Sequence, residues 1–266
     1  MNFFIQMRES VIDIKFYRSI KNNKFSRSFV YLLLLFLIIY SINGTKTYLG
    51  TKIIMEEMAD DLKTNVPEFR LENGEFSFEG EMPHYISSSI NELFVIDTTG
   101  KVTVSELKDV DTAILITRDK VYFKRSKLET REFNLTELKG FTLTKTDVLE
   151  LMPKLSIIVA VFLAFGFIFA LGWKLINAAI MALLGLIANT VFKGKLKFGN
   201  LMNICIYALT LPMLLQLAVN LYGYPIPNFW MIYWVISILY EVLAIKSCID
   251  EEKESEDTTG EDRSYF

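Results

Sequence analysis

Apolar residues are concentrated in four stretches of the chain that carry almost no charge. These stretches cover residues 29–42, 155–192, 201–222 and 228–245. Charged residues collect instead in the N-terminal segment, between about 45 and 154, and after Ser247. A helix needs about 20 mainly apolar residues to cross the hydrocarbon core of a bilayer. The pattern therefore predicts an α-helical integral membrane protein with a water-exposed segment after its first transmembrane helix.

The number of transmembrane helices depends on how the stretch 155–192 is divided. As a single helix it would extend roughly 57 Å, far more than a bilayer core of about 30 Å needs. A tight turn at Trp173-Lys174 would divide it into two spans and give five in all. Five spans place the basic turn 193–197 on the outer side, against the normal excess of cations inside, whereas four spans place it inside. We expect five spans, and four remain the alternative.

The segment before the first span is amphipathic and then basic. Apolar residues from Phe3 to Ile20 follow a loosely helical spacing, which predicts a helix on the inner membrane surface. A poorly ordered tail whose cations only set the topology is the alternative. The cations that follow or overlap this segment are Lys15, Arg18, Lys21, Lys24 and Arg27. By the positive-inside bias, residues 1–28 are cytoplasmic in a bacterial cell membrane. We expect residues 29–45 to form the first span as an uncleaved signal anchor, because the preceding segment is too long for a signal-peptide n-region and no small-x-small cleavage site follows; a cleavable signal is the alternative.

Residues 46–152 change from a helical to a strand-like pattern. Apolar residues at helical spacing in 50–63 predict that a helix continues from the membrane. From Pro67 the apolar positions alternate around an Asn73-Gly74 turn, which is a strong signal for a β-hairpin. Further strands are predicted at 92–97, 112–117, 121–124 and 130–135. We expect a small, mostly antiparallel extracytoplasmic α+β domain, followed by a transmembrane helical bundle at 153–248.

Composition narrows the class of protein further. The chain is 52% hydrophobic with a net charge of −3, and no basic stripe with interleaved aromatics occurs, so nucleic acid is not an expected partner. Both cysteines, Cys205 and Cys248, lie in or beside the apolar stretches, and the extracytoplasmic domain must therefore be stabilised by its own core. Residues 249–266 are acidic and polar and are expected to be disordered.

Enzymatic motifs are weak in this sequence. Asp97-Thr98-Thr99-Gly100 has one residue too many for an aspartic-protease loop, and a capped turn after a strand is the better interpretation. His84, the one histidine, follows Pro83 in an expected exposed loop and makes a poor metal site alone. No phosphate-binding loop, nucleophile elbow or zinc-protease pattern occurs. We therefore predict no catalytic, cofactor or metal site and expect that the protein is not an enzyme.

Polar residues within the apolar stretches carry more information, because hydrocarbon penalises them. A charged Glu241 side chain that faced lipid would have a high free-energy cost. It is therefore a candidate for protonation, for ion handling, or for pairing with Lys174 or a lysine of 193–197. A structural interfacial carboxylate is the simpler interpretation. Pro212 must kink its helix. The candidate intramembrane polar and kink positions are Asn177, Asn189, Tyr207, Pro212, Gln216 and Glu241.

Several motifs resemble one family of bacterial membrane proteins. These are the Pro-x-Phe-x-Leu-x-x-Gly pattern at 67–74, the run 141–145, the basic turn 193–198 and the Tyr-Ala-x-x-x-Pro element at 207–212. Together they resemble the DUF1189 family of Gram-positive bacteria over nearly the whole chain, and the last two resemble the broader Yip1-type membrane domain. The resemblance implies an inner-membrane protein, and Yip1-type relatives imply five spans and action through protein partners.

Two functional hypotheses follow from these observations. The first is a non-enzymatic membrane adaptor or sensor, whose extracytoplasmic domain binds a membrane or envelope protein partner while the bundle lies in the lipid bilayer. The second is a small transporter or ion-coupled permease component, suggested by Glu241, Asn177, Asn189 and Pro212. An intramembrane enzyme ranks last because no catalytic pair is present. Oligomeric state is left open.

Overall fold

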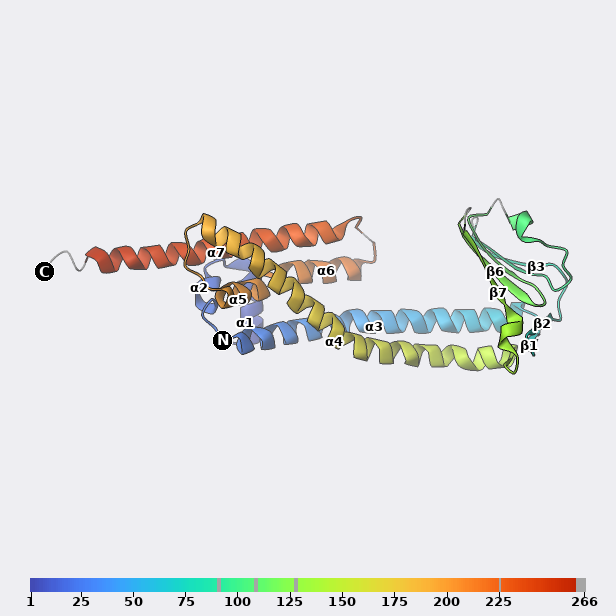
Figure 1. Cartoon of the computed structure of the whole chain (residues 1–266). Coiled ribbons are helices and arrows are strands. Elements are labelled where there is room, and N and C mark those ends of the chain that lie inside the picture. Colours follow the sequence, from blue (N-terminus) through green and yellow to red (C-terminus); the bar gives the residue numbers. More distant parts are fainter. Residues whose placement is uncertain (90–91, 108–109, 127–128, 225, 262–266) are drawn as a thin grey trace. The chain divides into compact units, whose positions relative to one another are not determined.

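The chain folds into two compact units (Figure 1). The computed structural model describes residues 1–89, 92–107, 110–126, 129–224 and 226–261. One unit, the helical unit, comprises Met1–Leu49 with Ala160–Phe266. The other, the β unit, comprises Gly50–Val159. Two long helices, α3 (Phe25–Asn65) and α4 (Lys145–Val191), each contribute residues to both units.

Four helical segments in the described part of the chain are long and apolar enough to cross a membrane. They are α3, α4, the α5–α6 pair at Phe198–Tyr222, and the Phe229–Glu254 part of α7. The pair consists of α5 (Phe198–Ala208) and α6 (Thr210–Tyr222), and α7 covers Phe229–Glu261. The expected class, a multi-pass helical membrane protein with a small β region after its first long helix, is confirmed.

The preferred count of five spans is wrong, and the alternative of four holds. The stretch 155–192 contains no turn at Trp173-Lys174, because α4 is continuous through it. Lys174 Nζ lies 3.1 Å from the Tyr233 hydroxyl and 4.5 Å from the centre of its ring. A lysine that has a polar and an aromatic partner can be accommodated in an apolar helix without a turn. At 1.5 Å per residue α4 extends roughly 70 Å, so it must continue beyond a bilayer core.

The N-terminal segment forms two short helices, α1 (Phe3–Ile12) and α2 (Phe16–Ile20), instead of one. The backbone N–H of Lys15 donates to Asp13 Oδ1 at 2.8 Å, a local bond that competes with helix continuation. Helix α1 packs on α5 and α6, and α2 packs on α5 and α7. Since Phe16, Tyr17 and Ile20 are buried, this segment is part of the bundle and does not rest on lipid alone.

The core of the helical unit joins residues from all its long helices. The rings of Tyr31 and Tyr207 stack with centroids 4.1 Å apart and an interplanar angle of 18°. Ala178 and Ala182 of α4 are fully buried, which lets neighbouring helices approach closely. Other buried members of this core are Leu32, Leu35, Met181, Leu201, Ile204, Met213 and Ile245.

The β unit contains two sheets (Figure 1). The three-stranded sheet has the order β2 (Glu75–Phe78), β1 (Phe69–Glu72), β8 (Thr142–Thr144). The five-stranded sheet has the order β3 (His84–Ser89), β4 (Glu92–Ile96), β5 (Thr112–Ile116), β6 (Lys120–Ser126), β7 (Glu129–Asn134). Only the β4–β5 pairing is parallel among these described strands. Two short 3₁₀ helices, Val104–Leu107 and Leu135–Leu138, complete the unit.

The predicted hairpin is confirmed, with positive φ at Asn73 (54°) and Gly74 (82°) between β1 and β2. Four further predicted strands correspond to β4 to β7, but β3 and β8 had no clear sequence signal. The prediction that His84 lies in an exposed loop is wrong: it begins β3, and its ring lies 5.1 Å from that of Phe78.

The acidic tail differs from its prediction. Residues 249–266 were expected to be disordered, yet α7 continues to Glu261, and residues 262–266 lie outside the described part. Two of its carboxylates, on Glu251 and Glu252, pair with Lys21. Lys21 lies 230 and 231 residues away from these two side chains, so local composition could not show the contact.

Candidate functional site

Glu241 of α7 is buried inside the helical unit, with 1% of its surface exposed. The thiol of Cys205 on α5 donates to its Oε1 over 3.2 Å. Gly185 of α4 faces the same carboxyl group, since a Cβ added there would lie 2.3 Å from Oε1. The structure thus places Glu241 beside Cys205 and Gly185, whereas Lys174, one of its predicted partners, lies against Tyr233.

Asn189 stabilises the turn between α4 and α5. Its Nδ2 donates to the Leu196 carbonyl at 3.1 Å, and its Oδ1 accepts from the Leu196 N–H at 3.3 Å. Lys193 adopts a φ of 59° in this turn, and a Cβ on Gly194 would lie 2.3 Å from Asn189 Oδ1. Asn189 therefore has a structural role in this basic turn.

The other four predicted positions are dispersed. Tyr207 is buried and its hydroxyl donates to Gln6 Oε1 at 2.6 Å. Asn177 is buried in α4, Pro212 is buried near the start of α6, and Gln216 is half-buried on α6. Within the described part of the chain, no hydrogen bond joins any of these four residues to Glu241.

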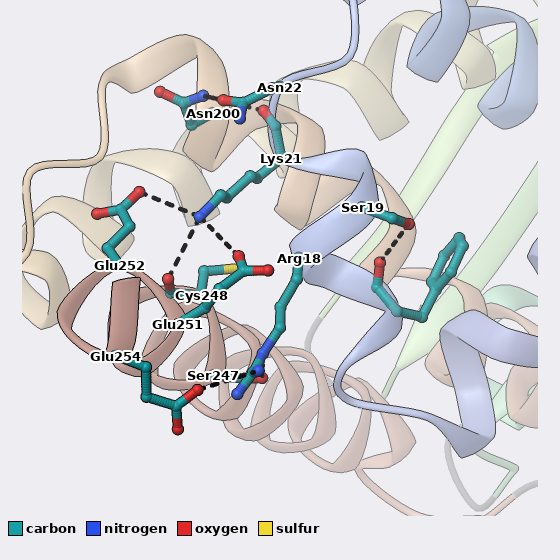
Figure 2. Close-up of polar contacts among 11 residues, drawn as sticks. Arg18, Ser19, Lys21, Asn22, Asn200, Ser247, Cys248, Glu251, Glu252 and Glu254 are labelled. Atoms are coloured by element: carbon teal, nitrogen blue, oxygen red, sulfur yellow. Dashed lines mark hydrogen bonds and ion pairs between the residues drawn. The ribbon is translucent and has the colours of Figure 1, made fainter. Parts of the chain in front are cut away.

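A polar cluster joins the two ends of the helical unit (Figure 2). Lys21 Nζ lies 3.0 Å from Glu251, 3.1 Å from Glu252 and 3.3 Å from the Cys248 carbonyl. Arg18 donates to the Ser247 hydroxyl at 3.1 Å and lies 3.8 Å from Glu254. These contacts require both ends of the bundle to lie on the same side of the membrane, in agreement with four spans.

Lys21 is protonated and positively charged at neutral pH. Burial lowers its pKa, but hydrogen bonds with Glu251 and Glu252 outweigh burial, and the pKa lies above its ordinary value. Sequence reasoning missed this cluster because 230 residues separate Lys21 from Glu251. The run of cations before the first span gave no reason to single out one lysine.

The β unit contains an apolar cavity of about 260 Å³. Strand side chains alternate between the two faces of a sheet. One face of the five-stranded sheet packs Val95 and Leu115 into a small core with Leu107. Phe94 and Ile116 belong to the opposite face, which opens on the cavity.

Both long helices and the three-stranded sheet complete the cavity wall. Met58 and Leu62 come from α3, Met152 comes from α4, and Phe69 and Phe76 come from β1 and β2. The rings of Phe69 and Phe76 stack with centroids 5.8 Å apart. The alternation of apolar positions indicated that these strands have apolar faces. It could not show which face lines a cavity, because that depends on how the strands are arranged in the sheets.

Asp97 directly follows β4 and begins a capped turn, as predicted. Its Oδ1 accepts from the Thr99 N–H at 2.9 Å, and its Oδ2 accepts from the Val102 N–H at 2.6 Å. Burial raises the pKa of this carboxyl, but hydrogen bonds from the Thr99 hydroxyl and from these backbone N–H groups outweigh burial and lower the pKa below its ordinary value. Within the described residues, no group of three or more His, Cys, Asp or Glu side chains could hold a metal ion.

Four candidate spans with a β unit inserted after the first define a multi-pass membrane protein. Comparison with known families gives a more specific result, because the family described as "Protein of unknown function (DUF1189)" matches residues 4–245. The chain belongs to the DUF1189 family. No curated protein and no solved structure matches it.

Proposed function

We propose that the protein is a non-enzymatic membrane adaptor or sensor whose β unit binds an apolar group of an envelope component or partner protein. The observation that supports this is the cavity in the β unit. Cavities of roughly 150 Å³ lined by apolar side chains accept benzene-sized ligands. The larger cavity here has room for one aromatic side chain or a short alkyl chain.

The position of the cavity within the chain supports a sensing role. Met58 belongs to α3 and Met152 to α4, and both helices include a candidate transmembrane span. A group bound in the cavity contacts these helices directly. Its differential affinity for two arrangements of α3 and α4 would shift the balance between them, which is the physical requirement for signalling.

Site-specific photocrosslinking in cells tests this proposal. A benzophenone analogue of phenylalanine is placed at Phe94, which lines the cavity, or at Phe133, an exposed residue of β7. We expect a defined adduct from position 94 that is absent from position 133 and lost when Ile116→Trp fills the cavity. Identical adducts from both positions, or no adduct at 94 in folded protein, would contradict the proposal.

The proposed topology places the N-terminus in the cytoplasm and the β unit outside the cell. It rests on the cations between Lys15 and Arg27, which precede the first span. We retain the uncleaved signal anchor as part of the same proposal, together with a Yip1-type relationship that has four spans in place of the five which that resemblance implied. Labelling with a membrane-impermeant maleimide should reach Glu129→Cys in intact cells and reach Lys195→Cys only after lysis.

A second candidate function, ion-coupled transport, is favoured by one observation, the burial of Glu241 between α4, α5 and α7. A carboxyl group in this position is a candidate for proton exchange during transport. Glu241→Gln should abolish a solute flux into proteoliposomes, whereas Glu254→Gln, on an exposed side chain, should not. Absence of flux for every solute tested with the native protein would remove this candidate.

A further inference from the structure

A second cavity, of about 710 Å³, lies in the helical unit between α1 and the start of α3. Phe3 and Gln6 of α1 form one wall, and the other consists of the linker before α3 and the first turns of α3. This cavity is remote in sequence from the cavity of the β unit. The proposed function makes no use of it.

Cations without acidic partners line one end of this cavity. Lys24 and Arg27 are exposed and contribute to its wall. Arg27 donates to the neutral Asn23 Oδ1 at 3.3 Å, and within the described ranges neither cation forms an ion pair. The residues that the structure assigns to the wall include no carboxylate. The cavity therefore has an excess of positive charge at this end.

The lining becomes apolar along α3 from the cationic end into the span. Arg27, Val30 and Leu34 lie three and four residues apart, so they share one face of the helix. Val30 and Leu34 remain 49% and 39% exposed, in a helix that crosses the membrane. From Arg27 to Leu34 the helix rises about 10 Å. Such a change from charged to apolar matches a lipid headgroup followed by its acyl chains.

Hydrogen bonds hold the cationic linker in place. Asn203 Nδ2 donates to the Asn23 carbonyl at 2.7 Å, and Asn200 Nδ2 donates to the Lys21 carbonyl at 3.0 Å. Asn200 also donates to Asn22 Oδ1 at 2.9 Å (Figure 2). Both asparagines belong to α5, so the linker is fixed to the bundle before any ligand binds. Preorganisation of this kind reduces the ordering cost of binding.

We infer that this cavity binds one anionic phospholipid of the bilayer. Lys24 and Arg27 contact the phosphate group, and the acyl chains lie along Val30 and Leu34. Two features distinguish this occupant from others: the unpaired positive charge selects an anionic headgroup over a zwitterionic one, and the exposed apolar face within a span selects a lipid over a soluble phosphate.

Native mass spectrometry of the full chain in detergent tests the inference with phosphatidylglycerol as the probe. We expect one tightly bound molecule, and about thirtyfold weaker binding after Lys24→Gln with Arg27→Gln, since each cation near a lipid headgroup contributes roughly 1 kcal/mol. Ser26→Trp obstructs the cavity without altering its charge and should weaken binding as well. Near-native affinity in either variant would overturn the inference.

The matched control removes the same charge from exposed positions elsewhere in the helical unit. Lys15→Gln with Lys246→Gln should leave phosphatidylglycerol binding within about twofold of the native value. An equal loss in this control would show general surface attraction and overturn the site. So would equal affinity for phosphatidylcholine, or full competition by soluble glycerol phosphate, which would point to a site for free phosphates. Unfolding midpoints of all variants exclude misfolding as the cause of any loss.

Discussion

The two units of this protein pack their interiors differently. In the helical unit small residues allow close approach, so that a Cβ at Gly185 would lie 2.3 Å from Glu241 Oε1 and 3.0 Å from Ile245 Cδ1. In the β unit one face of the main sheet packs into a small core, and the other lines a 260 Å³ cavity. The helical unit is thus closely packed around Glu241 and has its cavity beside α1 and the start of α3, whereas the cavity of the β unit lies directly against its main sheet.

The largest effect should come from the hairpin turn, where the β unit is tightly packed. Gly74 has a φ of 82°, and a Cβ there would lie 2.6 Å from Thr136 Cα and 2.7 Å from the Leu135 carbonyl oxygen. Gly74→Ala should destabilise the β unit by about 3 kcal/mol, through strain and overlap with backbone atoms. Limited proteolysis and urea unfolding measure the loss.

Gly100→Ala is the matched control for this turn. Gly100 has a φ of 75°, but nothing lies within 4 Å of an added Cβ. Only backbone strain remains, so we expect a loss of about 1 kcal/mol. Equal losses of stability in the two variants would show that overlap with the backbone of Leu135 and Thr136 does not contribute to the effect of Gly74→Ala.

The next effect tests the filled interior of the helical unit. Ala182 of α4 is fully buried, and Ala182→Leu adds three carbon atoms where no space exists. Overpacking should reduce stability by about 2 kcal/mol. Leu183→Met, on an exposed neighbour, should alter it by less than about 0.5 kcal/mol. Thermal unfolding in detergent compares both variants, and a neutral Ala182→Leu would disprove close packing.

Removal of the buried cation tests the connection between the two ends of the bundle. Lys21→Met should cost about 2 kcal/mol, because charge-assisted hydrogen bonds to Glu251 and Glu252 are lost. The folded pKa of Lys21 is raised, so its stabilisation is complete below the ordinary pKa near 10.5 and declines as pH rises through the folded value. Lys15→Met, on an exposed lysine, should show neither effect.

A buried carboxylate gives the β unit the opposite pH response. Asp97→Asn should cost about 1.5 kcal/mol, since the carboxylate accepts bonds from Thr99 and Val102. The folded pKa of Asp97 lies below 3.8, so its stabilisation is present above that value and is lost as pH falls through the folded pKa. Asp119→Asn, at an exposed turn, serves as control, and unfolding between pH 2 and 7 measures both.

The smallest change should have the opposite sign to Ala182→Leu. Ile86→Phe enlarges a side chain that lines the cavity of the β unit. Because space is present, added apolar contact should stabilise this unit by up to about 1 kcal/mol. The same variant should reduce crosslinking from position 94. A clear loss of stability, measured by urea unfolding, would mean that the cavity is not available to larger groups.

Local patterns predicted some elements well and others poorly. The Asn73-Gly74 hairpin was predictable because turn geometry depends on the turn residues themselves. The strand β3 was not, because Pro83 and the polar residues after it weaken the alternation on which strand prediction depends. The predicted number of spans was wrong because of residues 155–192. The length of this stretch suggested two helices, but α4 is one continuous helix that is longer than a bilayer core is thick.

The candidate sites were harder to predict than the fold, since they depend on contacts between distant segments. The sequence singled out Glu241 as a polar residue in an apolar stretch, and the structure buries it, but its neighbours Cys205 and Gly185 lie on other helices. The cations before the first span look equivalent in sequence. In the structure Lys21 is paired with the end of α7, whereas Lys24 and Arg27 line an open cavity.

The packing of α2 on α7 imposes an order on assembly during synthesis. Lys21 donates a hydrogen bond to the backbone carbonyl of Cys248, which follows it by 227 residues. A ribosome adds this number of residues in roughly 10 to 45 s. Throughout that interval α7, the last helix that packs on α2, is absent, so Phe16, Tyr17 and Ile20 are not fully covered. A nascent chain interrupted before α7 would therefore display an uncovered aromatic surface near its start, which is the kind of feature that chaperones and proteases recognise.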